Sequence, residues 1–145
     1  WDSVAGNLHV SILLKDVPVD CLTWIPLWVS VCVHQTLIEL EVDSAAIQLK
    51  WPNDIWVNHA KKAGGILCEK VGSSLIVGIG LNLIQAPHPD SAVIPFSKKI
   101  NRDHFLTLLV LKLKQPLFVP AVRTYYERFA LFAKKIAFSG FSINF

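Results

Sequence analysis

The sequence predicts an α+β fold in which a mixed, mostly antiparallel sheet carries helices packed on one of its faces. Hairpin-like pairs of short apolar strands occupy the middle of the chain, and strongly apolar helical segments lie before and after them. The order strand, helix, strands, helix, helix contains a single long crossover. This order favours the α+β class over a doubly wound parallel sheet.

The 145 residues are enough for one domain with a substantial core. Hydrophobic residues make up 52% of the chain and charged residues 17%. The longest apolar run, residues 22–33, is about a dozen residues and contains Pro26, whereas a membrane span takes roughly 20. We therefore expect no membrane partner. The start of the chain has no signal-peptide pattern, which predicts a cytoplasmic location.

The charge and cysteine patterns exclude two further classes of site. The net charge of +3 is mild and spread along the chain, so we expect no nucleic-acid partner. Cys21, Cys32 and Cys68 form neither a disulfide framework nor a CxxC pattern, which predicts reduced, buried thiols. His9 and His34 are interpreted as structural or exposed, and we expect no protein metal site.

The first third of the chain predicts a strand followed by a helix. Apolar and polar residues alternate along residues 7–15, which indicates a half-buried strand with His9 and Ser11 on the face away from the core. Residues 24–41 form a helix, for which Thr23 is the expected cap. Apolar residues occupy almost every side of this helix, so we expect it to be largely buried.

The middle of the chain predicts strands. Residues 46–50 form a short strand. Residues 54–58 and 64–71 form two antiparallel strands joined by a polar turn at residues 59–62. Residues 73–84 form another strand, in which glycines indicate a bulge or the close approach of a ligand.

The remainder predicts helices. After a Pro-rich loop at residues 85–99, Asn101 is the expected cap of a helix at residues 102–115, which Pro116 ends. A final amphipathic helix covers residues 120–135. The sequence contains no repeat, linker or second domain.

Four motifs point to a known family. They are "WDSVAGNLHVSILL" at residues 1–14, "KWPND" at 50–54, "KKAGGILCE" at 61–69 and "VGIGLN" at 77–82. In this order and spacing they closely resemble the catalytic domain of biotin protein ligases, also called biotin–[carboxylase] ligases. The first motif departs from the family pattern, since Val4 replaces the usual Pro and His9 the usual aromatic residue.

The resemblance implies the fold of class II aminoacyl-tRNA synthetases and biotin ligases, and a two-step reaction. Biotin carboxylate would attack the α-phosphate of ATP, with Mg²⁺, to give biotinyl-5'-AMP. A lysine of a biotin carboxyl carrier protein would then accept the biotin. Such a site must bring two repelling anions together, so it needs cations. The family also allows a homodimer.

The resemblance assigns the charged residues to catalysis. Lys62 matches the family lysine that reaches the biotin carboxylate and the α-phosphate. Lys50 is a second catalytic candidate and faces the same anions. Asp54 matches the aspartate that organises the site by pairing with a cation or a metal-bound phosphate.

The remaining candidates would bind the two ligands. Lys62, Gly65, Ile66, Gly78 and Gly80 are the predicted biotin-binding residues, with the glycines leaving room for the flat ring and Ile66 and its neighbour Leu67 supplying an apolar wall. The predicted residues for ATP and the adenylate are Trp1, Lys50, Asn53 and Asn82. An Asn amide both donates and accepts, which suits the adenine edge.

The sequence also lacks parts of the family pattern. The Arg/Gly-rich loop of the family precedes the position of Trp1, and the sequence contains no Met. No DNA-binding domain and no C-terminal β domain is recognisable. These features predict that residues 1–145 are a single, N-terminally truncated catalytic domain. Two alternatives stay open: a non-catalytic fragment that binds ligand weakly, and a lipoate or octanoate transferase relative.

Overall fold

The computed structural model describes residues 5–129. Strands dominate the middle of this range and helices its two ends. In chain order the elements are β1 (Leu8–Leu14), a 3-10 turn η1 (Val19–Cys21), α1 (Ile25–Glu39), β2 (Ile47–Lys50), β3 (Asp54–Val57), β4 (Lys61–Val71), β5 (Ser74–Leu81), α2 (Arg102–Leu113) and α3 (Val119–Phe129).

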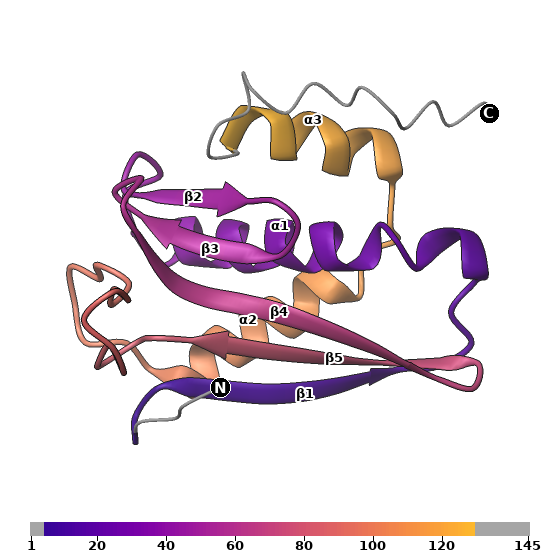
Figure 1. Ribbon diagram of the computed structural model, residues 1–145, viewed down its shortest axis with the longest axis horizontal. Coiled ribbons are helices and arrows are strands. Elements are labelled where there is room, and N and C mark those ends of the chain that lie inside the picture. Colours follow the sequence, from indigo (N-terminus) through magenta and orange to yellow (C-terminus); the bar gives the residue numbers. More distant parts are fainter. Residues whose placement is uncertain (1–4, 130–145) are drawn as a thin grey trace.

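The five strands form one sheet in the order β1-β5-β4-β3-β2. Every pair of neighbours is antiparallel, so the predicted mixed sheet is antiparallel throughout these strands. In Figure 1, α1 and α2 lie behind the sheet, and α3 runs beside the edge strand β2. The predicted α+β class, with helices packed on one face, is confirmed.

The period-two pattern of β1 is confirmed. Leu8 is buried and belongs to the core, whereas His9 and Ser11 lie on the exposed face. The same alternation runs through β5, where Val77 and Ile79 are buried against the helices. One face of the sheet therefore builds the core, and the other face remains for a site.

The long helix α1 is buried on nearly every side, as its apolar sequence predicts. The predicted cap is wrong: the helix begins after Trp24, and no side chain caps it. Pro26 in the first turn supplies the fixed backbone angle that a helix start needs, so the helix can begin without a cap from Thr23. The helix ends at Glu39, two residues before the predicted end.

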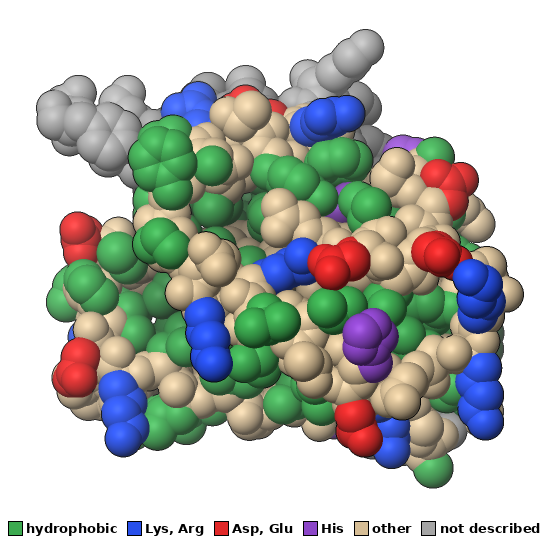
Figure 2. Space-filling view, turned by 180° about the vertical axis from the view of Figure 1, so that it is seen from behind, with side chains coloured by type: hydrophobic (Ala, Val, Ile, Leu, Met, Phe, Trp, Pro, Cys, Tyr) green, Lys and Arg blue, Asp and Glu red, His purple; other side chains and the backbone are tan. Residues whose placement is uncertain are grey.

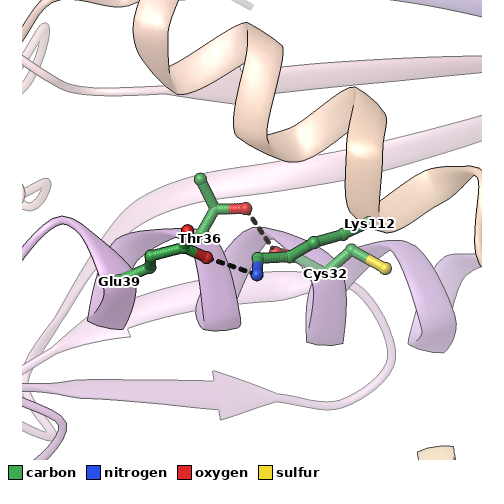
Figure 3. Close-up of polar contacts among 4 residues, drawn as sticks. All are labelled: Cys32, Thr36, Glu39 and Lys112. Atoms are coloured by element: carbon green, nitrogen blue, oxygen red, sulfur yellow. Dashed lines mark hydrogen bonds and ion pairs between the residues drawn. The ribbon is translucent and has the colours of Figure 1, made fainter.

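An ion pair joins α1 to α2, and a hydrogen bond beside it lies within α1. Lys112 donates to Glu39 at 2.5 Å, and the Thr36 hydroxyl donates to the Cys32 carbonyl at 2.8 Å (Figure 3).

Burial raises the pKa of Cys32 to about 12 and that of Cys68 to about 11. Both thiols are therefore protonated at neutral pH and poorly nucleophilic.

The start of α2 follows the sequence signal, whereas its end at Leu113 is two residues before the predicted end. The Asn101 side chain accepts hydrogen bonds from the backbone N–H groups of Asp103 and His104, so the predicted cap is confirmed. The last predicted helix begins at Val119, one residue before the expected start. Its predicted extension from residue 130 to residue 135 lies outside the described residues.

The hairpin between β3 and β4 differs from the prediction. The tight turn is residues 58–60, in which Asn58 and His59 take positive φ angles of 50° and 55°. The strand β4 already begins at Lys61, so Lys61 and Lys62 are strand residues rather than turn residues. This difference matters because the side chains of a strand point alternately to the two faces of the sheet.

The helical face is chemically mixed. Figure 2 shows acidic and basic side chains interspersed with hydrophobic ones over this face. Two of the ion pairs here are Lys98 with Glu41 and Lys112 with Glu39. Within residues 5–129, no helix is both long enough and apolar enough to cross a bilayer.

A buried histidine joins α1 to α3. His34 is 0% exposed, with Nε2 3.2 Å from the Ile47 carbonyl and Nδ1 3.1 Å from the Tyr125 hydroxyl. A carbonyl only accepts, so Nε2 carries the proton and the Tyr125 hydroxyl donates to Nδ1. Burial is the main cause that lowers the pKa of His34 from 6.5 to about 4.

We predict that His34 makes folding stability dependent on pH. The unfolded chain binds a proton on His34 more tightly than the folded chain does. The stability that the neutral His34 contributes is therefore fully present above about pH 6.5 and is lost as the pH falls toward 4. The loss is on the order of 3 kcal/mol. Urea unfolding of wild type and His34→Gln between pH 7.5 and 4.5 measures it.

The control variant is His104→Gln, which removes an exposed histidine from α2. It should keep the wild-type pH slope, whereas His34→Gln should flatten the slope between pH 6.5 and 4.5. Equal slopes for all three proteins would show that His34 does not titrate on unfolding.

Candidate functional site

A β-bulge in β4 decides where its lysines and glycines point. Residues three apart on a regular strand lie on opposite faces. In β4, Lys62 pairs with Trp56, and Gly64 pairs with the residue that precedes Trp56. Ala63 is therefore an extra residue, and it brings Lys62 and Gly65 to the same face.

A row of five residues crosses the exposed face of the sheet. From β1 to β2 the row is His9, Gly80, Gly65, Asp54 and Lys50. Neighbouring strands are about 4.8 Å apart, so the first and fourth members are roughly 14 Å apart. Gly80 and Gly65 have no side chains, so they form a flat floor with polar groups at both of its ends.

An open groove of about 480 Å³ lies over this floor. Its lining includes His9 and Ser11 from β1, Gly78 and Gly80 from β5, and Lys62 from β4. These residues alternate with core residues along their strands, so the groove is on the face away from α1 and α2. A groove with a flat floor can accept a flat, largely apolar ligand.

Lys62 and Asp54 form an ion pair at one end of the floor. Lys62 Nζ lies 2.7 Å from Asp54 Oδ1, and the two side chains are 40% and 20% exposed. A Cβ on Gly65 would lie only 3.2 Å from Lys62 Nζ and 3.3 Å from Asp54 Oδ1. The missing side chain of Gly65 therefore makes room for this ion pair.

Of the two residues predicted for the apolar wall, Leu67 faces the groove and the Ile66 side chain does not. The Ile66 side chain is 1% exposed in the core, and only its backbone faces the groove, because strand alternation turns it toward the helices. The Leu67 side chain is on the groove face and is 62% exposed. The prediction that the Ile66 side chain forms this wall is wrong.

Asn53 joins the loop between β2 and β3 to β4 by hydrogen bonds. Its side-chain amide donates to the Ile66 carbonyl at 2.6 Å, and its own carbonyl accepts from the Ile66 N–H at 2.9 Å. It also lines the groove. One of the two amide N–H donors is thus used within the protein, beside the place where a ligand would bind.

Asn82 joins the end of β5 to the Pro-rich loop. Its side chain is 2% exposed and donates to the Ala92 carbonyl at 3.0 Å. Its backbone N–H donates to the Ala63 carbonyl of the bulge at 2.8 Å. Among the described residues the buried Oδ1 atom has no hydrogen-bond partner. The predicted pairing of this amide with adenine stays a prediction, and Oδ1 is an acceptor that no described residue uses.

Lys50 is on the same face as the ion pair but does not line the groove. Its ammonium nitrogen lies 3.9 Å from the centre of the Trp56 ring, which is a cation–π contact. As the strand partner of Asp54, it lies at the end of the glycine row. Trp1, the predicted adenine-stacking residue, lies outside the described residues.

Two polar residues of the groove lining were not among the predicted site residues. His9 and Ser11 are two apart on β1 and both face the groove. Their alternation with apolar residues already placed them on the non-core face. Identifying the site additionally required the pairing of β1 with β5, which sets them beside Gly80 and Gly78. Within residues 5–129, no three His, Cys, Asp or Glu residues are grouped to hold a metal ion.

Comparisons with known proteins agree with this arrangement. Residues 1–83 match the profile of the biotin/lipoate A/B protein ligase family. A biotin–[acetyl-CoA-carboxylase] ligase of Mycobacterium tuberculosis is 38% identical over 81 residues, which are 55% of this chain and 30% of the relative. The chain thus spans less than a third of that relative.

Two solved structures resemble the fold. Biotin protein ligase from Leishmania major in complex with biotinyl-5-AMP has a TM-score of 0.79 and 25% identity, covering 90% of this chain and 63% of that one. Biotin protein ligase from Aquifex aeolicus in complex with biotin and ATP has a TM-score of 0.67 and 29% identity, covering 88% and 55%.

We predict that two glycines of the sheet differ in their tolerance of alanine. A Cβ on Gly64 would lie 2.4 Å from Leu81 Cδ2 and 2.8 Å from the Gly80 carbonyl, whereas one on Gly78 would meet Leu67 atoms at 3.6 Å and beyond. Gly64→Ala should therefore lower the free energy of unfolding by about 2–3 kcal/mol, as an overpacked core does.

Gly78→Ala is the matched control and should unfold within about 1 kcal/mol of wild type. Urea unfolding at pH 7.5 measures both variants. Equal stability of the two would contradict the packing described for the junction of β4 and β5.

Proposed function

Because more than half of it matches the family profile, the chain belongs to the biotin/lipoate A/B protein ligase family, and we propose that it is a biotin ligase. It forms biotinyl-5'-AMP from biotin and ATP. It then transfers the biotin to a lysine of a biotin carboxyl carrier domain. The observation that carries this proposal is the glycine floor that ends at the Lys62–Asp54 ion pair.

The floor fits the body of biotin. Gly65 and Gly80 are paired neighbours, so a flat ring system can lie directly on the backbone there. Leu67 provides an apolar side wall beside Gly78, which has space above it. The carboxylate end of the ligand would then point toward Lys62.

Lys62 offsets the negative charge of the reaction. In the first step the biotin carboxylate oxygen attacks the α-phosphorus of ATP, and pyrophosphate leaves. The ammonium group stabilises the carboxylate and the phosphoryl oxygens as they approach each other. Asp54 holds the ammonium at the end of the floor until the ligands arrive.

The second step transfers the biotin to the carrier domain. The carrier lysine amine attacks the acyl carbon of biotinyl-5'-AMP, the amide bond forms, and AMP leaves. The amine must be neutral to attack, so a proton is lost in this step. Lys50 and Asn53 are the candidates for holding the adenylate phosphate, and Asn82 for its base, with Mg²⁺ entering on the ATP phosphates.

The test of this function uses two proteins. One is the chain itself, and the other is a chimera in which this chain replaces the segment of the M. tuberculosis relative that it matches. Each is incubated with Mg²⁺, labelled ATP and either biotin or lipoate, and the adenylate and its transfer to a carrier domain are measured. A folded chimera that forms no biotinyl-5'-AMP, while the intact relative does, contradicts the proposal.

The same assay tests the role of Lys62. Lys62→Ala should lower the rate of adenylate formation by a factor on the order of 10²–10³, since a preorganised cation is lost. Lys61→Ala is the matched control, because Lys61 Nζ donates to the Pro89 carbonyl outside the groove lining. An unchanged rate for Lys62→Ala would remove Lys62 from catalysis.

A further inference from the structure

Trp56 is a large aromatic residue that does not serve the core. It lies in β3 between Ile55 and Val57, whose buried side chains point toward the helices, so its ring is on the face of the sheet that carries the groove. Among the described residues it belongs neither to the hydrophobic core nor to the side chains packed against that core. Its position therefore calls for an explanation other than core packing.

The indole N–H of Trp56 does not supply that explanation. The nitrogen is buried and has no hydrogen-bond acceptor within residues 5–129, although a buried indole N–H usually has one. A buried donor without an acceptor is costly, and a phenylalanine would avoid this cost. What the indole offers beyond a phenyl ring is a face that holds a cation more strongly.

A cation does lie on this face. Lys50 Nζ is 3.9 Å from the centre of the Trp56 ring. The pairing of β2 with β3 explains the contact, because Lys50 opposes Asp54 and Gln48 opposes Trp56. Lys50 and Trp56 are thus diagonal neighbours on one face, which long and aromatic side chains can bridge.

The two lysines of the site are held crosswise. Lys62 opposes Trp56 on the neighbouring strand, yet its ammonium lies 2.7 Å from Asp54 Oδ1. Lys50 opposes Asp54, yet its ammonium lies on the Trp56 ring. Opposite charges that face each other directly across two strands attract, so Asp54 is an alternative partner for Lys50. Within residues 5–129 Lys50 nevertheless forms no ion pair.

We propose that Trp56 is a positioning residue whose ring keeps the Lys50 ammonium off Asp54, so that Lys50 stays available for an anion at this end of the glycine floor. If both lysines shared Asp54, the carboxylate would offset part of the charge of each, and an incoming anion would have to break that network. On an uncharged ring, Lys50 keeps its full positive charge.

This arrangement gives the site one cation on a carboxylate and one on a ring. Lys62 is fixed by Asp54 over Gly65, and Lys50 lies two residues away along the neighbouring strand pair with no carboxylate to compete for it. The inference rests on the proposed function only for the identity of the anion, which is ATP. The separation of Lys50 from Asp54 does not depend on that identity.

A ligand-free experiment on the full chain tests this separation. The melting temperatures of Lys50→Met, Asp54→Asn and the double variant are measured with Trp56 present and again in the Trp56→Leu background. With Trp56 present, the two changes should be additive within about 1 °C, because the groups do not touch. In the Trp56→Leu background they should depart from additivity by about 2 °C, because Lys50 then pairs with Asp54.

Two further variants make the comparison specific. Trp56→Tyr keeps an aromatic face and should restore additivity. Lys61→Met is the matched control, because Lys61 Nζ donates to the Pro89 carbonyl, and its effect should add to that of Asp54→Asn in every background. If Trp56→Leu does not fold, Trp56→Ile replaces it, since Ile favours strands. Additive effects of Lys50→Met and Asp54→Asn in all backgrounds would overturn the proposal.

A binding experiment adds the anion. Calorimetric titration of the chain with ATP and Mg²⁺ should show about 3-fold weaker binding for Trp56→Leu and binding within about 2-fold of wild type for Trp56→Tyr. In the Lys50→Met background, Trp56→Leu should have no further effect. Unchanged binding for Trp56→Leu, or an equal loss in both backgrounds, would overturn the proposal. If wild type does not bind ATP, the proposed function fails, and the ligand-free experiment still decides the role of Trp56.

Discussion

The β-bulge at Ala63 is the constraint on which the groove depends. One extra residue in β4 puts Lys62 on the same face as Gly65, and the side chain of Lys62 then lies over that glycine. The bulge is held from outside by two hydrogen bonds, from Asn82 N–H to the Ala63 carbonyl and from Ala92 N–H to the Lys62 carbonyl. The Pro-rich loop that follows β5 therefore fixes the direction of the lysine through the backbone.

The helices also hold the edge strand β2 in place. His34 joins α1 to α3 while it also binds the backbone of β2 at Ile47. The edge strand β2 pairs with β3 from Lys50 and Asp54 onward, so it carries the end of the glycine row. A buried neutral imidazole is thus connected through backbone hydrogen bonds to the strand that presents Asp54.

The fold and the glycine floor could be predicted from the sequence, whereas the charged end of the site could be predicted only in part. Alternation along residues 7–15 and the motif at 77–82 depend on neighbours in the chain, which a sequence displays directly. The bulge shifts the register by one residue, and no local pattern marks it, so Lys62 was expected in a turn and the Ile66 side chain in the groove.

The ligands of the proposed reaction need more positive charge than the groove lining supplies. Among the described residues that line the groove, Lys62 is the only lysine or arginine. A carboxylate and a triphosphate together carry more negative charge than one ammonium group offsets, so further positive charge has to arrive with the nucleotide or from nearby. Lys50 is the strand partner of Asp54 and is held by a cation–π contact with Trp56, which is weaker than an ion pair when partly exposed. Within the proposed function Lys50 is therefore the nearby cation, because leaving Trp56 costs it less than leaving Asp54 costs Lys62.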